Sequence, residues 1–224
     1  MFKQLFFFVM LAFTLASCSD FNSLKVKKTN FGDEVLRAQN LVFTFNKELL
    51  NDSSLINRWD SVQYIKFTPP IPGKFMWTGK SELTFSPMGS LLPATNYTAT
   101  LSDELLRYKK EKYSIKDKPL TFHTPFLNII SINTFWSLSE ETANQVEVRC
   151  QVNLNNPVSP VKLKPLLKLL VGGKEMPYRI ITQNDAETIE LAFPFDPKTT
   201  LDEIKGEAII EKGLICTGGN TAST

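Results

Sequence analysis

Residues 145–154 alternate strictly between polar and apolar side chains. The sequence QVEVRCQVNL places one apolar side chain at every second position. Successive side chains of a β-strand point to opposite faces, so the pattern predicts a strand with one face in a core. The residues expected on that face are Val146, Val148, Cys150, Val152 and Leu154.

Shorter stretches of the same kind recur along the chain and are separated by turn residues about every 8–12 positions. This spacing is typical of antiparallel sandwiches rather than of strand–helix–strand units. The 17 phenylalanines supply the bulky side chains that two packed sheets bury between them. Helical character is limited to residues 52–60 and 102–112, where Ser102 is expected to cap a short turn. The fold class expected is all-β, as two tandem antiparallel β-sandwiches.

The domain boundaries follow from these blocks. Residues 35–125 are expected to form the first sandwich and residues 126–216 the second. The mixed, polar residues 18–34 are expected to be a tether, and residues 217–224 (TGGNTAST) a linker or a truncated end.

The first 17 residues carry the marks of an export signal. Lys3 precedes an apolar run over residues 5–13 that is too short to span a bilayer, so a cleaved signal peptide is expected. The sequence Leu-Ala-Ser-Cys over residues 15–18 resembles the bacterial lipobox, which implies that Cys18 is lipidated, palmitate included, and becomes the membrane anchor. Ser19 in place of Asp resembles proteins sent to the outer membrane, on its periplasmic or its outer surface. Stable anchoring needs several acyl chains, which such a cysteine carries.

Charge and motifs exclude several classes of function. The 25 basic and 23 acidic residues give a net charge of +2, so no nucleic-acid partner is expected. The single histidine, His123, cannot form a multi-histidine metal site, and it is expected to pack on an edge strand. No phosphate loop, dinucleotide fingerprint, nucleophile elbow or CxxC pair occurs. We therefore expect no enzyme, no cofactor, no metal and no catalytic residue. The adjacent carboxylates Glu140 and Glu141 are expected to be solvated.

Two cysteines and one tryptophan remain as candidate site residues. Cys150 and Cys216 either form a disulfide, which an oxidising envelope permits, or are buried separately as small apolar residues. Trp59 lies in a polar loop and is the tryptophan expected to contact a ligand. Trp77 and Trp136 are expected to lie in the core.

An ordered string of motifs resembles a known family. The motifs are FTPP (67–70), GKFMW (73–77), LTFSP (83–87) and LPATNYT (92–98), followed by FHT at residues 122–124. This string is similar to the bacterial Ig-like sandwiches at the start of α2-macroglobulin-like lipoproteins. The second block then resembles the family's next macroglobulin-type domain.

The resemblance implies a role in protease inhibition, because family members trap proteases after cleavage of a bait segment. No cysteine of this chain is followed by the family's Cys-x-Glu-Gln thioester sequence. The expected function is therefore a non-enzymatic structural segment that is anchored in the cell envelope. Its expected partners are the membrane and either downstream macroglobulin domains or another envelope protein. The alternative is a free-standing two-domain surface lipoprotein that binds a glycan or a protein.

Overall fold

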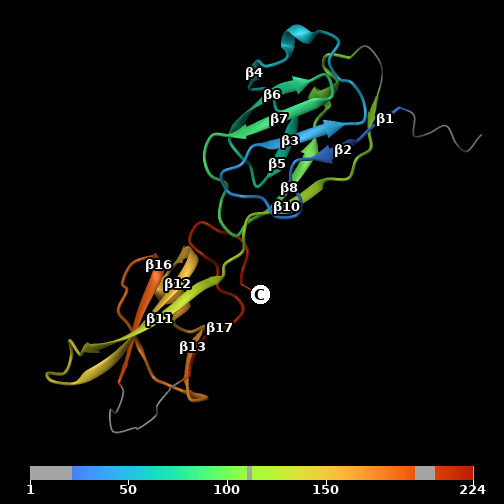
Figure 1. Ribbon diagram of the computed structural model, residues 1–224. Coiled ribbons are helices and arrows are strands. Elements are labelled where there is room, and N and C mark those ends of the chain that lie inside the picture. The colour runs from blue at the N-terminus through green and yellow to red at the C-terminus, as the bar shows by residue number, and fades with distance from the viewer. Residues whose placement is uncertain (1–21, 110–112, 195–204, 224) are drawn as a thin grey trace, which may run out of the picture. The chain divides into compact units, whose positions relative to one another are not determined.

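The computed structural model describes residues 22–109, 113–194 and 205–223 (Figure 1). The chain divides into two compact units. Unit 1 holds residues up to 91 and residues 97–122, and unit 2 holds residues 92–96 and everything from residue 123 onward. Strands dominate both units, so the all-β prediction is confirmed.

Unit 1 packs a five-stranded sheet and a three-stranded sheet around one core. The larger sheet has the order β2-β3-β7-β6-β4 and the smaller one the order β10-β8-β5, while β1 and β9 pair in parallel. The strand pairs of the larger sheet are antiparallel, and so is the pair of β5 and β8 in the smaller one. The strands are β1 (Ser23–Leu24), β2 (Val26–Thr29), β3 (Leu41–Phe45), β4 (Trp59–Asp60), β5 (Ile65–Thr68), β6 (Gly73–Gly79), β7 (Glu82–Pro87), β8 (Asn96–Leu101), β9 (Ser114–Ile115) and β10 (Leu120–His123).

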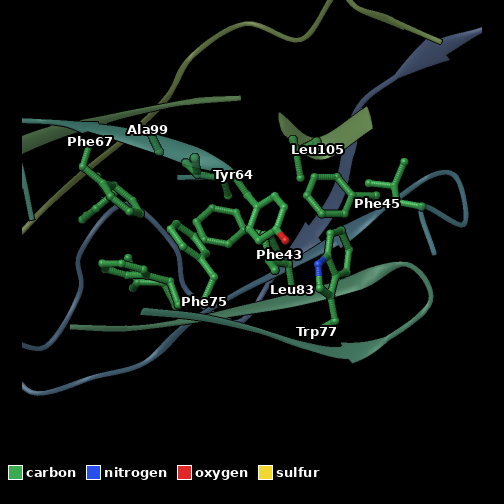
Figure 2. Packing of buried hydrophobic residues seen from close by; sticks show 14 of the residues in the cluster. Phe43, Phe45, Tyr64, Phe67, Phe75, Trp77, Leu83, Ala99 and Leu105 are labelled. Atoms are coloured by element: carbon green, nitrogen blue, oxygen red, sulfur yellow. The ribbon is translucent and has the colours of Figure 1, made fainter. Parts of the chain in front are cut away.

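Alternation explains how these strands build the core. In β3, Leu41, Phe43 and Phe45 are buried while the residues between them are half-buried. Figure 2 shows the aromatic side chains that fill the space between the sheets, with Tyr64 among them. The Tyr64 ring meets Phe75 and Trp77 edge-on, at centroid distances of 5.7 and 5.4 Å. Such edge-to-face contacts add about 0.5–1.5 kcal/mol each to the burial of the rings.

The two helical insertions are short 3-10 turns that begin as the sequence predicts. The first spans Ser53–Leu55, and the backbone N–H of Ser54 donates to the Asp52 carboxylate (2.8 Å). The second spans Asp103–Leu106, where the Ser102 hydroxyl accepts from the N–H of Glu104 (3.3 Å).

The prediction of a tether over residues 18–34 is wrong for the part that the structure describes. Leu24 is completely buried, and β2 joins β3 at the edge of the larger sheet. The apolar side chains of this segment fill the core, while the lysines between them face outward. Lysines on an edge strand also discourage pairing with other chains. Residues 18–21 lie outside the described residues, as does the predicted signal peptide.

Unit 2 packs a four-stranded antiparallel sheet, in the order β11-β12-β16-β15, and a three-stranded sheet, in the order β14-β13-β17, around a second core. All of the predicted strand over residues 145–154 except Gln145 lies in β12, the longest strand of the described chain. The elements are β11 (Ile129–Leu138), β12 (Val146–Val158), the helical turn α2 (Pro160–Leu163), β13 (Leu167–Val171), β14 (Lys174–Glu175), β15 (Arg179–Ile180), β16 (Ala186–Pro194) and β17 (Gly206–Ile210).

The prediction that residues 217–224 are a linker is wrong up to residue 223. The N–H of Thr217 donates to the carbonyl of Pro157 (2.8 Å), and the N–H of Ser223 donates to the carbonyl of Leu214 (2.7 Å). The N–H of Thr221 donates to the carbonyl of Ala94 (2.9 Å), in the short segment 92–96 that belongs to unit 2. These hydrogen bonds hold the segment against unit 2, next to the buried Leu214 and Cys216.

Candidate interaction surface on the edge strand β11

The strand β11 is the most unusual surface of the molecule, because both of its faces are exposed. It lies at one end of the four-stranded sheet and pairs with β12 along one side (Figure 1). Eight of its ten residues are exposed, among them Ile130, Ile132, Phe135, Trp136 and Leu138. Exposed apolar residues scattered singly are ordinary, whereas a contiguous group marks a site of interaction.

The pairing register divides these side chains between the two faces of the sheet. Ile132, Trp136 and Leu138 lie opposite Val152, Val148 and Val146 of β12, on the face that covers the core of unit 2. At Val152 this face is completely buried, but toward the far end of the hairpin Val146 is 36% exposed, Trp136 59% and Leu138 69%. The apolar face therefore extends beyond the part that the second sheet covers.

The opposite face of the same sheet carries a cluster of charged side chains. Arg149 is buried and donates to Glu147 (2.6 Å) and Glu190 (2.7 Å), and it also contacts Glu140 (3.3 Å). Arg179 on β15 donates to both carboxylate oxygens of Glu147 (3.0 Å each). Burial of Glu147 alone would cost several kcal/mol, and these two guanidinium groups offset that cost.

The ion pairs outweigh burial in setting the charge of this cluster. Burial alone would raise the pKa of Glu147, but its bonds to Arg149 and Arg179 hold that pKa below the usual range. Burial would likewise lower the pKa of Arg149, but Glu190, Glu147 and Glu140 raise it. Both side chains therefore stay ionised at neutral pH.

Two acidic residues that the sequence predicts to be solvated cover this cluster. Glu140 contacts Arg149, and Glu141 contacts Arg179 (3.4 Å), although their side chains remain 74% and 68% exposed. The prediction is therefore correct for their exposure and incomplete for their partners. A groove of about 380 Å³ lies beside the cluster and is lined by residues that include Glu141, Glu147 and Tyr178.

The cysteines of unit 2 are two buried thiols. Cys150 and Cys216 are 1% and 2% exposed, and in the described structure they are not joined as a disulfide. The burial of both residues agrees with the interpretation as small apolar side chains, and the disulfide stays a prediction. Burial raises the pKa of the Cys150 thiol, which lowers its reactivity. The lipidation candidate Cys18 lies outside the described residues.

The three tryptophans are not all buried or exposed as predicted. Trp77 is buried, as expected, but Trp136 is 59% exposed on β11, so its predicted place in the core is wrong. The exposure of this face rises toward the end of the hairpin where Trp136 lies. Trp59 is 52% exposed on the edge strand β4, opposite Met76. Its predicted contact with a ligand stays a prediction.

His123 packs on an edge strand. Its ring stacks on Phe126 at a centroid distance of 4.1 Å, and its Nδ1 lies 3.0 Å from the carbonyl oxygen of Thr124. In the part of the chain that the structure describes, no three His, Cys, Asp or Glu side chains are grouped to hold a metal ion. None of the described helices has the length and apolar character needed to cross a membrane.

The sequence pattern alone does not predict β11 as a strand. One feature of the sequence does indicate an uncharged strand here. Residues 126–139 contain no Asp, Glu, Lys or Arg and carry apolar residues at positions 130, 132, 136 and 138. The adjacent Thr134, Phe135 and Trp136 break the alternation, because both faces of this strand carry bulky side chains.

No protein family and no curated protein matches the sequence. Three solved structures of L,D-transpeptidases from Mycobacterium tuberculosis are similar at 13% identity and a TM-score of 0.30. One is L,D-transpeptidase 3 alone, one is an L,D-transpeptidase from strain H37Rv, and one is L,D-transpeptidase 3 with a faropenem-derived adduct. The matches cover 70%, 70% and 79% of this chain and 64%, 65% and 76% of those chains. The chain thus spans about two thirds of the first two enzymes, and this degree of likeness assigns neither a fold family nor an activity.

Proposed function

We propose that this chain is a non-enzymatic interaction segment of the bacterial cell envelope, held at the outer membrane by a lipid on Cys18. Its β-units belong, in this proposal, to an α2-macroglobulin-like protease inhibitor. The chain itself supplies neither bait nor thioester but docks a neighbouring polypeptide, either downstream macroglobulin domains or another envelope protein.

The observation that carries this proposal is the exposed apolar strand β11. Ile132, Trp136 and Leu138 lie on the core-facing side of the sheet, and their exposure rises toward the end of the hairpin. Burying apolar area is favourable by about 25 cal/mol per Å², so such a surface is suited to contact with another protein. The opposite face of the sheet carries the ion cluster, in which Arg149 and Arg179 pair with Glu147 and Glu190. These paired charges stabilise the sheet and are not a reactive group.

The anchoring part of the proposal is tested by fractionating the cell envelope. The full chain and a Cys18→Ser variant are expressed in a bacterial host and followed with an antibody against residues 35–216. The proposal expects the parent chain in the outer-membrane fraction, labelled by radioactive palmitate, and the variant without label. An unlabelled parent chain would contradict the lipid anchor.

The inhibitor part of the proposal is tested by the size of the native product in its own host. A band far larger than this chain supports a long macroglobulin-like molecule, and protease capture is then assayed on that molecule. A band of this chain's own size, which is 25.4 kDa, would overturn the inhibitor assignment.

One observation supports the alternative of a free-standing lipoprotein that binds a glycan. Trp59 exposes 52% of its surface at a sheet edge, and a flat indole ring is a common stacking partner for sugars. Under this alternative, Trp59→Ala abolishes glycan binding by the full chain. Unchanged binding to every glycan recognised by the parent protein would count against it.

A further inference from the structure

The strand β11 lacks the devices by which proteins protect an edge strand. Edges are usually blunted by lysines, by proline or by a covering element. Residues 126–139 contain no charged residue and no proline, and β11 is ten residues long. In unit 1, by contrast, the edge strand β2 carries Lys27 and Lys28. An edge of this length and composition is suited to pairing with another strand.

The pairing register shows which backbone groups of β11 point outward. The N–H of Ser139 donates to the carbonyl of Gln145 (2.8 Å), and the register continues without a shift from Ser131 to Leu138. Residues of an antiparallel pair alternate between those that bond the partner strand and those that point away from it. Residues 131, 133, 135, 137 and 139 therefore bond β12, and the N–H and C=O groups of Ile132, Thr134 and Leu138 point to the open edge.

The apolar side chains are arranged symmetrically about Thr134. Ile132 and Trp136 lie two residues before and after it, and Ile130 and Leu138 lie four residues before and after it. When this strand meets an identical strand running the opposite way, Thr134 lies opposite Thr134 of the other copy. Ile132 of each copy then lies opposite Trp136 of the other.

We propose that β11 pairs with β11 of a second copy of this chain, antiparallel and about a two-fold axis through Thr134. The two four-stranded sheets then become one continuous eight-stranded sheet. This inference rests on the proposed role as an interaction segment, and it names the partner.

A second copy fits this edge better than an unrelated strand for two reasons. The strand carries no charge, so two copies meet without like-charge repulsion. On the core-facing side of the strand the pairs nearest the axis are Thr134 with Thr134 and Ile132 with Trp136, and cross-strand pairs of these kinds stabilise a sheet. On the other side Phe135 of each copy lies opposite Asn133 of the other. The exposed parts of Trp136 and Phe135 alone amount to about 200 Å² per copy. Ile130, Ile132 and Leu138, which are 68%, 41% and 69% exposed, add to this apolar contact area.

Disulfide cross-linking of the full chain tests the proposed register. In a directly opposed, hydrogen-bonded pair the Cα atoms lie about 5.5 Å apart, within the range that a disulfide spans. Cys150 lies directly opposite Thr134 on β12 and would compete for the new thiol, so both cysteine variants are made in a Cys150→Ala background. In that background Thr134→Cys is expected to form a covalent dimer in the envelope of the expressing cells. The matched control is Ser131→Cys, which is also exposed on β11, because its two copies would lie about 20 Å apart. This control is expected to stay monomeric on a non-reducing gel.

A charge substitution tests the same contact without a covalent bond. Thr134→Lys places two lysines opposite each other on the axis, so the dimer dissociation constant is expected to rise at least about tenfold in sedimentation of the detergent-purified full chain. Val161→Lys, at a residue that is 80% exposed on α2, is the control and is expected to leave the dimer intact. Circular dichroism checks that all variants stay folded.

Three outcomes would overturn the inference. A parent chain that sediments as a monomer at every attainable concentration would do so, as would a dimer unaffected by Thr134→Lys. A Thr134→Cys cross-link to a different protein would replace the second copy with that protein and leave the proposed function standing. Loss of palmitate labelling with an intact β11 dimer would instead remove the anchor and leave this inference standing.

Discussion

Removal of the Arg149 guanidinium should lower the free energy of unfolding of unit 2. The loss should be larger than is usual for a substitution on the outer face of a sheet. Arg149→Met keeps most of the side-chain length but deletes the contacts to Glu147, Glu190 and Glu140. Glu147, whose side chain is 7% exposed, then retains Arg179 alone, while Glu190 is 27% exposed and water can reach it.

The size of the effect follows from where the cluster lies. Breaking a fully buried ion pair from one side costs about 3–5 kcal/mol, and an exposed pair contributes about 0–1 kcal/mol. Only Arg149 and Glu147 are hidden from water, and they lie beneath Glu140 and Glu141, which are themselves mostly exposed. We therefore expect a loss of about 2 kcal/mol in the free energy of unfolding at neutral pH.

The pH dependence has a defined sign. In the parent protein the pKa of Glu147 is held below its usual range, so its contribution is present above the ordinary glutamate pKa. That contribution is lost as the pH falls through the lower pKa of the folded state. In Arg149→Met only Arg179 is left to compensate for the burial of Glu147, so the pKa of Glu147 rises. The difference in stability between parent and variant should therefore shrink as the solution is acidified from pH 7 to about pH 4.

The assay is urea unfolding followed by circular dichroism, at neutral and at acidic pH. Lys168→Met is the matched control, because Lys168 pairs with Glu211 on the surface with both side chains nearly half exposed. A much smaller loss is expected there, since water replaces an exposed partner. The reasoning fails if Arg149→Met is no more damaging than Lys168→Met, or if its effect does not change with pH.

Three further predictions concern packing and the buried polar groups. Gly73→Ala should lower the free energy of unfolding by about 1–3 kcal/mol in urea titrations, because the added Cβ would lie 2.4 Å from the ring of Phe85; stability equal to the parent's would contradict that contact. Cys150 and Cys216 should resist alkylation in native protein and react fully in urea, as mass spectrometry would show, because both are buried; rapid labelling of native protein would refute this. Tyr64→Phe should cost about 1 kcal/mol, measured by the same urea titration, since the Tyr64 hydroxyl donates to a carboxylate at 2.7 Å; a stabilised variant would refute that contribution.

The sequence predicts those strands that bury one face and leave the other face at least partly exposed. In β3 and in the middle of β12, alternate residues face a core and the pattern is visible directly. The burial of Trp77 follows for the same reason, because Phe75 lies on the same side of its strand.

The sequence fails where burial depends on partners that are distant in the chain. Glu147 and Arg149 occupy the positions of β12 expected to face water, and they are buried by Arg179 on β15 and by Glu190 on β16. No local pattern shows this, because the four residues meet only after three strands have paired. The thiols of Cys150 and Cys216 present the same difficulty, since the separation of two sulfur atoms is a property of the folded unit.

The surface β11 is missed for a different reason. A strand with apolar residues on both faces resembles a buried strand or an irregular segment, and an exposed position has no distinct sequence pattern. Its lack of charge is visible in the sequence, but the sheet order is needed to show that this uncharged strand lies at an edge.

The assignment of residues 92–96 to unit 2 has a consequence for the order in which the protein is made. Unit 1 has all its residues once the ribosome has passed residue 122. Unit 2 must wait, because Asn220 and Thr221 bond Ala94 and Asn96, and so join segments about 125 residues apart. During synthesis from the amino terminus, unit 1 can therefore fold early, while an early part of the chain stays open until the last residues emerge. A chain interrupted shortly before residue 220 would present a finished first unit and a second unit that lacks its closing contacts.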